Sequence, residues 1–137
     1  MEKDQTELVK SVSEKRGFSL NYHKLLAKND PELLRKWDDL YTAGAFQKRF
    51  LSNRELELVG ITINTVLKWS TGLQIHLKRA IDLGVTEQEI MQVFSRVAMT
   101  VGIPCMIFGA DVYAELKKNN FKYFFTQPNP DEPEPKK

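Results

Sequence analysis

Residues 52–84 read SNRELELVGITINTVLKWSTGLQIHLKRAIDLG, and this stretch decides the fold. Ser52 followed three residues later by Glu55 is a capping-box pattern, which marks the start of a helix. The β-branched residues between 59 and 66 are also compatible with a buried strand, and Gly60 weakens a helix. The length of the segment and the cap at its start favour a helix.

A second helix follows within the same stretch. Ser70 or Thr71 can cap its start, and Gly84 marks its end. The apolar residues at helical spacing on its inner face are Leu73, Leu77, Ala80 and Ile81. His76 lies among them, so the sequence raises the question whether this histidine is packed or reactive.

Similar signals on both sides extend the helical pattern. Asp30 before Pro31 predicts a helix that runs to Gly44, with the proline in its first turn. Thr86 with Glu89 is another capping box, and it opens a helix that ends at the sequence GIP. A last helix is expected from about residue 104 to 118. We therefore predict an all-α fold of antiparallel helices joined by short loops.

Composition excludes several classes of protein. The 137 residues carry a formal net charge of +2 with basic and acidic residues interspersed, which does not indicate a nucleic-acid partner. No apolar run is long enough to span a membrane and the N-terminus is too polar for a signal peptide, so we expect a soluble, cytoplasmic protein. Cys105 is the single cysteine, which excludes an intramolecular disulfide, and no residue spacing indicates a metal site. We expect no cofactor.

The two ends differ from the body in composition. Residues 1–28 predict two short helices that meet at Gly17 and form an N-terminal arm. Residues 126–137 are rich in proline and lack apolar side chains, so they predict a disordered tail. The body between them, residues 29–125, is expected to form the helical domain.

The body resembles the carboxymuconolactone decarboxylase family, which includes the alkylhydroperoxidase D-like proteins. The matching pieces lie between Glu57 and about Glu115: RELEL, HLKRAIDLGVTEQEI and VAMTVGIPCMIFGADVYAEL. The resemblance implies an all-helical protomer that assembles with itself, commonly as trimers or hexamers, with pockets near subunit contacts.

The resemblance also assigns candidate site residues. The peroxidase branch has a Cys-x-x-Cys-x-x-x-His motif and a glutamate on the preceding helix. In that branch the second cysteine supplies the reactive thiol, and the glutamate and the histidine relay protons. His76 matches the histidine and Glu57 the glutamate, and Glu55 is better explained as a capping residue. Trp69 and Gly72 occupy the two cysteine positions, so the disulfide redox cycle is expected to be absent.

The decarboxylase branch lacks these cysteines too and has an H-x-x-x-A-x-x-x-G segment, which His76, Ala80 and Gly84 reproduce. Some of those enzymes carry acidic residues just before the histidine, where this chain has residues 70–72 with the sequence STG. This departure puts the original lactone substrate in question.

The chemistry of such a pair points to proton transfer. A carboxylate beside an imidazole fixes its tautomer and makes it a general acid or base, as decarboxylation or a proton shift next to a carbonyl requires. Arg96 and Lys68 are candidates to bind a substrate carboxylate, and Trp69 and Cys105 are candidates to line the pocket.

Three functions therefore stay open. The chain is a lyase or isomerase for a small carboxylated lactone or keto acid, a non-enzymatic helical oligomer that binds a ligand or a partner, or a thiol-dependent peroxidase that uses Cys105.

Overall fold

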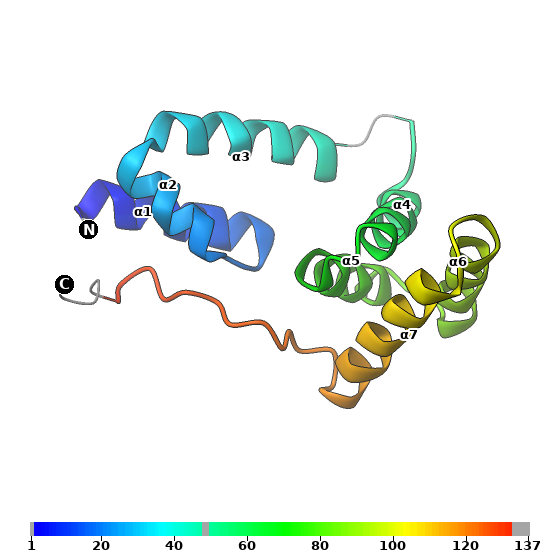
Figure 1. Cartoon of the computed structure of the whole chain (residues 1–137). Coiled ribbons are helices and arrows are strands. Elements are labelled where there is room, and N and C mark those ends of the chain that lie inside the picture. The colour runs from blue at the N-terminus through cyan, green and yellow to red at the C-terminus, as the bar shows by residue number, and fades with distance from the viewer. Residues whose placement is uncertain (1, 48–49, 133–137) are drawn as a thin grey trace. The chain divides into compact units, whose positions relative to one another are not determined.

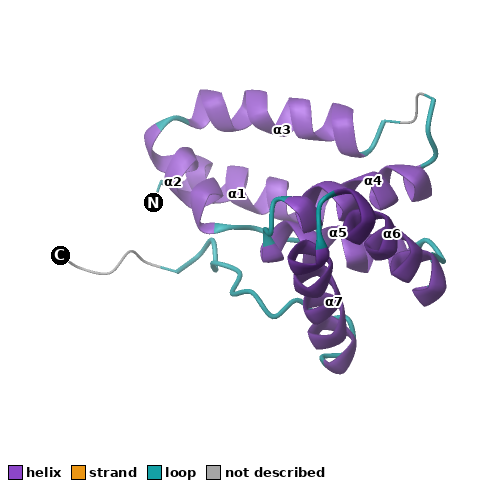
Figure 2. Ribbon diagram, turned by 45° about the vertical axis from the view of Figure 1, so that its right-hand side comes forward, coloured by secondary structure: helices purple, strands orange, loops and turns teal. Residues whose placement is uncertain are grey.

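Within residues 2–47 and 50–132, which the computed structural model describes, the chain forms helices and no strand (Figures 1 and 2). The all-α fold expected from the sequence is confirmed. The helices are α1 (Lys3–Arg16), α2 (Asn21–Asn29), α3 (Pro31–Ala45), α4 (Asn53–Val66), α5 (Ser70–Asp82), α6 (Glu87–Thr100) and α7 (Ile103–Lys118).

The capping signals start the helices where the sequence predicts. Ser52 Oγ accepts a hydrogen bond from Glu55 N at 3.1 Å, and the Glu55 carboxylate accepts one from Ser52 N at 2.7 Å. The same reciprocal pair joins Thr86 and Glu89 at the start of α6. Residues 59–66 are therefore helical, because the cap and the α4 packing outweigh the strand propensity of the β-branched side chains.

The expected cap of α5 was wrong. Neither Ser70 nor Thr71 caps this helix, because it begins at Ser70 itself and Trp69 takes the cap position without a side-chain hydrogen bond. The physical reason is the extended backbone of Trp69, whose carbonyl already accepts the first helical bond from Leu73 N at 3.0 Å.

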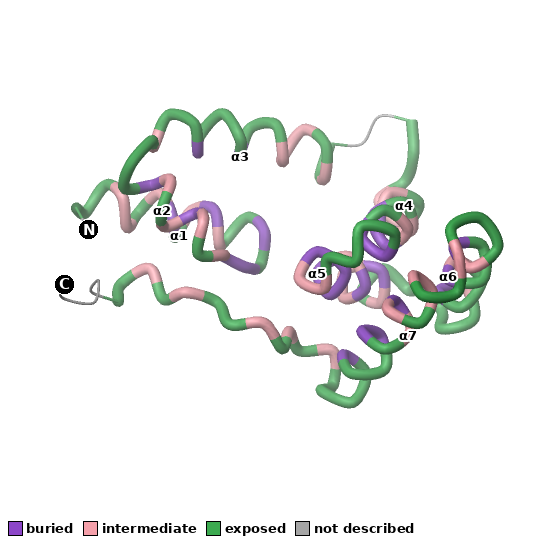
Figure 3. Tube along the Cα trace, viewed as in Figure 1, coloured by how far each residue is buried: buried purple, intermediate pink, exposed green. Residues whose placement is uncertain are grey.

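The chain divides into two compact units: residues 1–47 with 126–137, and residues 48–125. The second unit holds α4, α5, α6 and α7, and the residues that Figure 3 colours as buried lie where these helices face one another. Its fully buried residues include Ile61 on α4, Leu73 and Leu77 on α5, Ile90 on α6 and Leu116 on α7. This core fixes how α4 and α5 pack together.

The first unit differs from the predicted domain boundary. The arm was expected to end at residue 28, but α3 groups with α1 and α2 through the buried side chains Val9, Ala27 and Leu34. The proline-rich segment was expected to be disordered from residue 126. Residues 126–132 instead contact this unit: Gln127 Oε1 accepts from Ser19 N at 3.1 Å, and Asp131 pairs with Lys10 at 2.9 Å. The remainder of that segment, residues 133–137, lies outside the described residues.

In the described part of the chain, no helix has the length and apolar character needed to cross a membrane.

Candidate functional site

The site is a pair of side chains on two consecutive helices. Glu57 lies in the second turn of α4 and His76 in the second turn of α5, and these helices pack against each other. The distance from His76 Nδ1 to Glu57 Oε2 is 2.7 Å. The structure therefore brings together the two residues that the sequence placed 19 positions apart.

Gly60 makes this approach possible. It follows Glu57 by one helical turn, and the imidazole of His76 lies directly against its backbone. A Cβ atom at position 60 would be 2.4 Å from His76 Nδ1 and 2.6 Å from Cγ. Because real Cβ atoms do not approach so closely, only glycine leaves room for the ring. Gly60, which weakened the helix prediction, is thus the residue whose missing side chain leaves room for the imidazole of His76.

The two partners differ in exposure. The Glu57 side chain is 8% exposed and the His76 side chain 25% exposed. With Nδ1–H donating to the carboxylate, the imidazole has its lone pair on Nε2. Nε2 has no hydrogen-bond partner among the described residues, so it is the nitrogen available to a molecule from solvent. This arrangement can accept a proton on Nε2 and return it.

A second contact between α4 and α5 lies one turn further along. Gly72 precedes His76 by one turn, and a Cβ atom there would be 2.2 Å from Asn64 Oδ1 and 2.3 Å from Trp69 Cε3. Asn64 and Trp69 thus occupy the space of a side chain at position 72. The pattern of residues alone did not single out Asn64. The available signal was its spacing of seven residues from Glu57, which places both on one face of α4.

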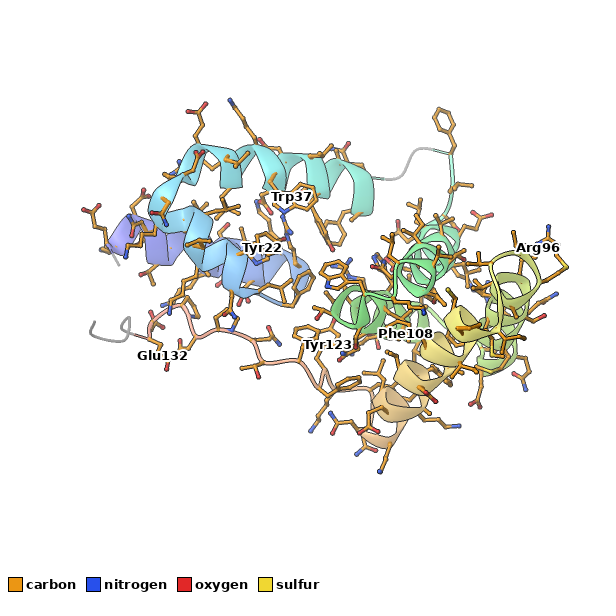
Figure 4. The ribbon with its side chains drawn as sticks, in the orientation of Figure 1. Tyr22, Trp37, Arg96, Phe108, Tyr123 and Glu132 are labelled. Carbon is orange, nitrogen blue, oxygen red and sulfur yellow. The ribbon has the colours of Figure 1, made fainter. Side chains whose placement is uncertain are left out.

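The remaining predicted site residues lie elsewhere in the same unit. Arg96 is exposed on α6, on the side of this helix away from α5 in Figure 4, and no hydrogen bond or ion pair joins it to His76 or Glu57 within the described residues. Lys68 is exposed in the turn before α5, with a positive φ of 52°. Cys105 is half-buried in the first turn of α7. In the described part of the chain, Lys68 and Cys105 likewise have no hydrogen bond or ion pair with His76 or Glu57.

The first unit contains a buried polar cluster that the sequence did not reveal. The Arg16 side chain is 1% exposed and donates to Asp38 Oδ1 at 2.9 Å, while its guanidinium lies 3.8 Å from the centre of the Tyr41 ring. Burial tends to raise the pKa of Asp38, but the hydrogen bonds from Lys15 and Arg16 outweigh it and hold this pKa below its usual value.

His23 belongs to this cluster, although the sequence assigned it no role. It is fully buried, and its Nδ1 accepts a hydrogen bond from Leu20 N at 2.9 Å. Burial, together with the positive charge of Arg16, lowers the pKa of His23 to about 4. Tyr22 and Trp37 point toward each other beside it (Figure 4), with Trp37 Nε1 donating to the Tyr22 hydroxyl at 3.0 Å. The cluster is internally satisfied, which favours a structural role.

A separate open cavity of about 480 Å³ lies between α6 and α7, and neither His76 nor Glu57 lines it. Within the described residues, no group of three or more His, Cys, Asp or Glu side chains is placed to hold a metal ion.

The sequence model of the carboxymuconolactone decarboxylase family matches residues 31–115, a span that runs from α3 into α7 and includes His76 and Glu57. No protein of curated function and no solved structure matches the chain.

Proposed function

The chain belongs to the carboxymuconolactone decarboxylase family, and on this premise we propose that it is a lyase or isomerase for a small carboxylated lactone or keto acid. In this proposal His76 transfers the proton, and Glu57 orients the imidazole of His76. The observation that supports this most is the 2.7 Å contact between His76 Nδ1 and a Glu57 carboxylate that is itself nearly buried. A carboxylate in this position stabilises the imidazolium that forms when Nε2 takes up a proton.

The proposed reaction has two forms. In an isomerisation, Nε2 removes a proton from the carbon next to a carbonyl group, the electron pair of that C–H bond forms an enolate, and the imidazolium returns the proton to another carbon. In a decarboxylation, His76 starts protonated. The bond to the carboxylate breaks, its electron pair enters the conjugated carbonyl, carbon dioxide leaves, and the imidazolium protonates the carbon.

The mechanism needs no thiol, which agrees with Trp69 and Gly72 at the two cysteine positions. General acid–base catalysis by a positioned side chain contributes about 10²- to 10⁴-fold to rate. Loss of His76 is therefore expected to remove most of the activity.

Self-assembly is part of the proposal. Large apolar side chains remain 46% to 68% exposed on this unit, and a partner subunit would cover them: Val59, Ile63, Leu67, Trp69, Met99, Val101, Ile103 and Ile107. We propose a homo-oligomer such as a trimer or hexamer. Sedimentation equilibrium measures the number of subunits directly.

The proposed function is tested by following the exchange of C–H hydrogens of candidate substrates for deuterium in heavy water. The protein is incubated in D₂O with a panel of unsaturated carboxylated lactones and keto acids, and NMR follows deuterium uptake and loss of the carboxylate. We expect at least one compound to exchange or decarboxylate, with His76→Ala inactive and Glu57→Gln at least tenfold slower. Lys78→Ala is the matched control, since Lys78 lies on the same helix and pairs only with Asp82 among the described residues.

Other outcomes select the alternatives. Consumption of an organic hydroperoxide that is lost in Cys105→Ala and retained in His76→Ala would indicate thiol chemistry. No reaction with any compound, together with unchanged folding of His76→Ala, would indicate a non-enzymatic oligomer that binds a ligand or partner.

A further inference from the structure

The open cavity between α6 and α7 takes no part in the proposed proton transfer. These two helices lie side by side (Figures 1 and 2), and the cavity follows one face of α7 from Ala110 to Lys118, with Glu87 and Met91 of α6 on its other side. Its volume of about 480 Å³ falls within the range of about 300–1,000 Å³ that small-molecule sites occupy. The cavity is therefore large enough for a small organic compound.

Most of the lining is apolar. Ala110 and Ala114 lie one turn apart on α7, and their short side chains leave a hollow that larger residues would fill. Tyr113, which is 4% exposed, lines the cavity from the side of the core. Met91 on α6 is 38% exposed, and its flexible thioether can adapt to the shape of an alkyl chain. The lining thus offers contacts to an apolar ligand body.

The charged groups of the lining lie at one end of the cavity. Lys117 Nζ donates to the two Glu87 carboxylate oxygens at 3.0 and 3.1 Å, so these two charges compensate each other. Burial, together with the Glu87 carboxylate, raises the pKa of Tyr113, so its hydroxyl stays neutral. Lys118 has no hydrogen bond or ion pair within the described residues. The lining therefore carries one uncompensated positive charge.

This arrangement indicates the chemical class of the ligand. A single positive charge complements a monoanion, whereas a phosphate monoester would bring nearly two negative charges at pH 7. An exposed ion pair contributes little, so the apolar body of the ligand has to supply most of the affinity. Lys117 follows Ala110 by about 10 Å along the helix axis, which leaves room for a chain of medium length beside the charged end.

We propose that this cavity binds a monocarboxylate with an alkyl chain of medium length. The chain lies over Ala110 and Ala114 beside Met91, and the carboxylate accepts a hydrogen bond from the ammonium group of Lys118. Because neither His76 nor Glu57 lines the cavity, the inference does not rest on the proposed lyase or isomerase function.

The probes are octanoate, 1-octanol and octylammonium, which share one alkyl chain and differ in the charge of the head group. Their dissociation constants are measured on the full chain by NMR titration of the methionine methyl groups, with Met91→Leu to assign the Met91 signal. Met99 is the internal control, because it lies on α6 outside the cavity lining. We expect octanoate to shift the Met91 signal and not that of Met99.

The head group determines the expected order of affinity. Octanoate should bind about fivefold more tightly than 1-octanol, which is the contribution of one exposed ion pair. Octylammonium should bind more weakly than 1-octanol, because its charge has the same sign as that of Lys118.

The decisive variants change the hollow and the charges separately. Ala114→Leu fills the hollow and should weaken octanoate and 1-octanol at least tenfold. Lys118→Ala should abolish the preference for octanoate over 1-octanol, and Glu87→Gln, which frees Lys117, should increase this preference about fivefold. Lys122→Ala is the matched control, because Lys122 is an exposed lysine outside the lining, and it should keep the preference. The charge variants alter exposed side chains only, so they test the proposal even if Ala114→Leu does not fold.

Four results would overturn the proposal: no shift of the Met91 signal with octanoate at millimolar concentration, equal binding of octanoate and 1-octanol, undiminished binding to a folded Ala114→Leu variant, or the same loss of preference in Lys122→Ala as in Lys118→Ala. The first result is also expected if a second copy of the chain covers the cavity. None of these results bears on the deuterium exchange through His76, so this proposal and the proposed function fail separately.

Discussion

The absence of a side chain at Gly60 allows the imidazole of His76 to lie within hydrogen-bond distance of Glu57. Replacing Gly60 by alanine tests this. The new methyl group would lie 2.4 Å from His76 Nδ1. An ordinary non-bonded contact is about 3.5 Å, so the ring has to move by about 1 Å. The hydrogen bond of 2.7 Å to Glu57 would then lengthen beyond the range of a hydrogen bond.

Two opposing effects set the expected change in stability. Alanine inside a helix is about 1 kcal/mol more favourable than glycine. Overpacking of a well-packed contact costs about 1–3 kcal/mol. The free energy of unfolding of Gly60→Ala is therefore expected to change little, from no change to a loss of about 2 kcal/mol. Activity is expected to fall about 100-fold, because a catalytic group displaced by 1 Å loses its alignment.

The assay that needs no substrate is long-range ¹H–¹⁵N NMR of the neutral imidazole. In the wild-type protein we expect the Nδ1–H tautomer, because Nδ1 faces the carboxylate of Glu57. In Gly60→Ala this preference should disappear. Gly44→Ala is the matched control, because a Cβ at helical position 44 meets nothing within 4 Å, and it should gain up to about 1 kcal/mol without any change at His76.

A double-mutant cycle separates the cost of the clash with His76 from the gain that alanine brings over glycine inside a helix. In a His76→Ala background the added methyl has no ring to meet, so Gly60→Ala should become stabilising by about 1 kcal/mol. If Gly60→Ala keeps the Nδ1–H tautomer and full activity, the reasoning from the close contact is refuted.

Three further predictions concern stability. The fold lowers the pKa of His23 from 6.5 to about 4. Between pH 6.5 and pH 4 the unfolded chain therefore binds more protons than the folded chain. As a result, the first unit loses stability as the pH falls through this range. We expect the free energy of unfolding to fall by about 2–3 kcal/mol between pH 7 and pH 4.5, and by much less in His23→Gln. Urea unfolding followed by Trp37 fluorescence, in a Trp69→Phe background, measures this change. Asp38→Asn leaves the buried charge of Arg16 without its carboxylate and should cost about 3 kcal/mol at pH 7 in the same assay; a cost below 1 kcal/mol would contradict the importance of this ion pair. Ser52→Ala removes the cap of α4 and should lower the free energy of unfolding by about 1 kcal/mol, and no change in thermal unfolding would mean that this cap is not stabilising.

Local chemistry made much of the fold predictable. The capping residues Asp30, Ser52 and Thr86 act through hydrogen bonds to amides three residues away, so sequence spacing alone locates the helix starts. The α5 start escaped prediction because the backbone conformation of Trp69, rather than a side-chain acceptor, begins that helix. The grouping of α3 with α1 and α2 escaped it too, since that depends on which apolar faces meet in space.

The candidate site divides in the same way. Residue type and spacing determined the helix periodicity. The resemblance to the family, which the family match bears out, assigned Glu57 and His76 as the candidate pair. Only the tertiary structure decided that Gly60 receives the imidazole, that Asn64 and Trp69 fill the space at Gly72, and that Arg96 lies apart from the pair. These are contacts between helices, and they depend on how α4 and α5 pack at atomic distance, which no spacing along one chain segment specifies.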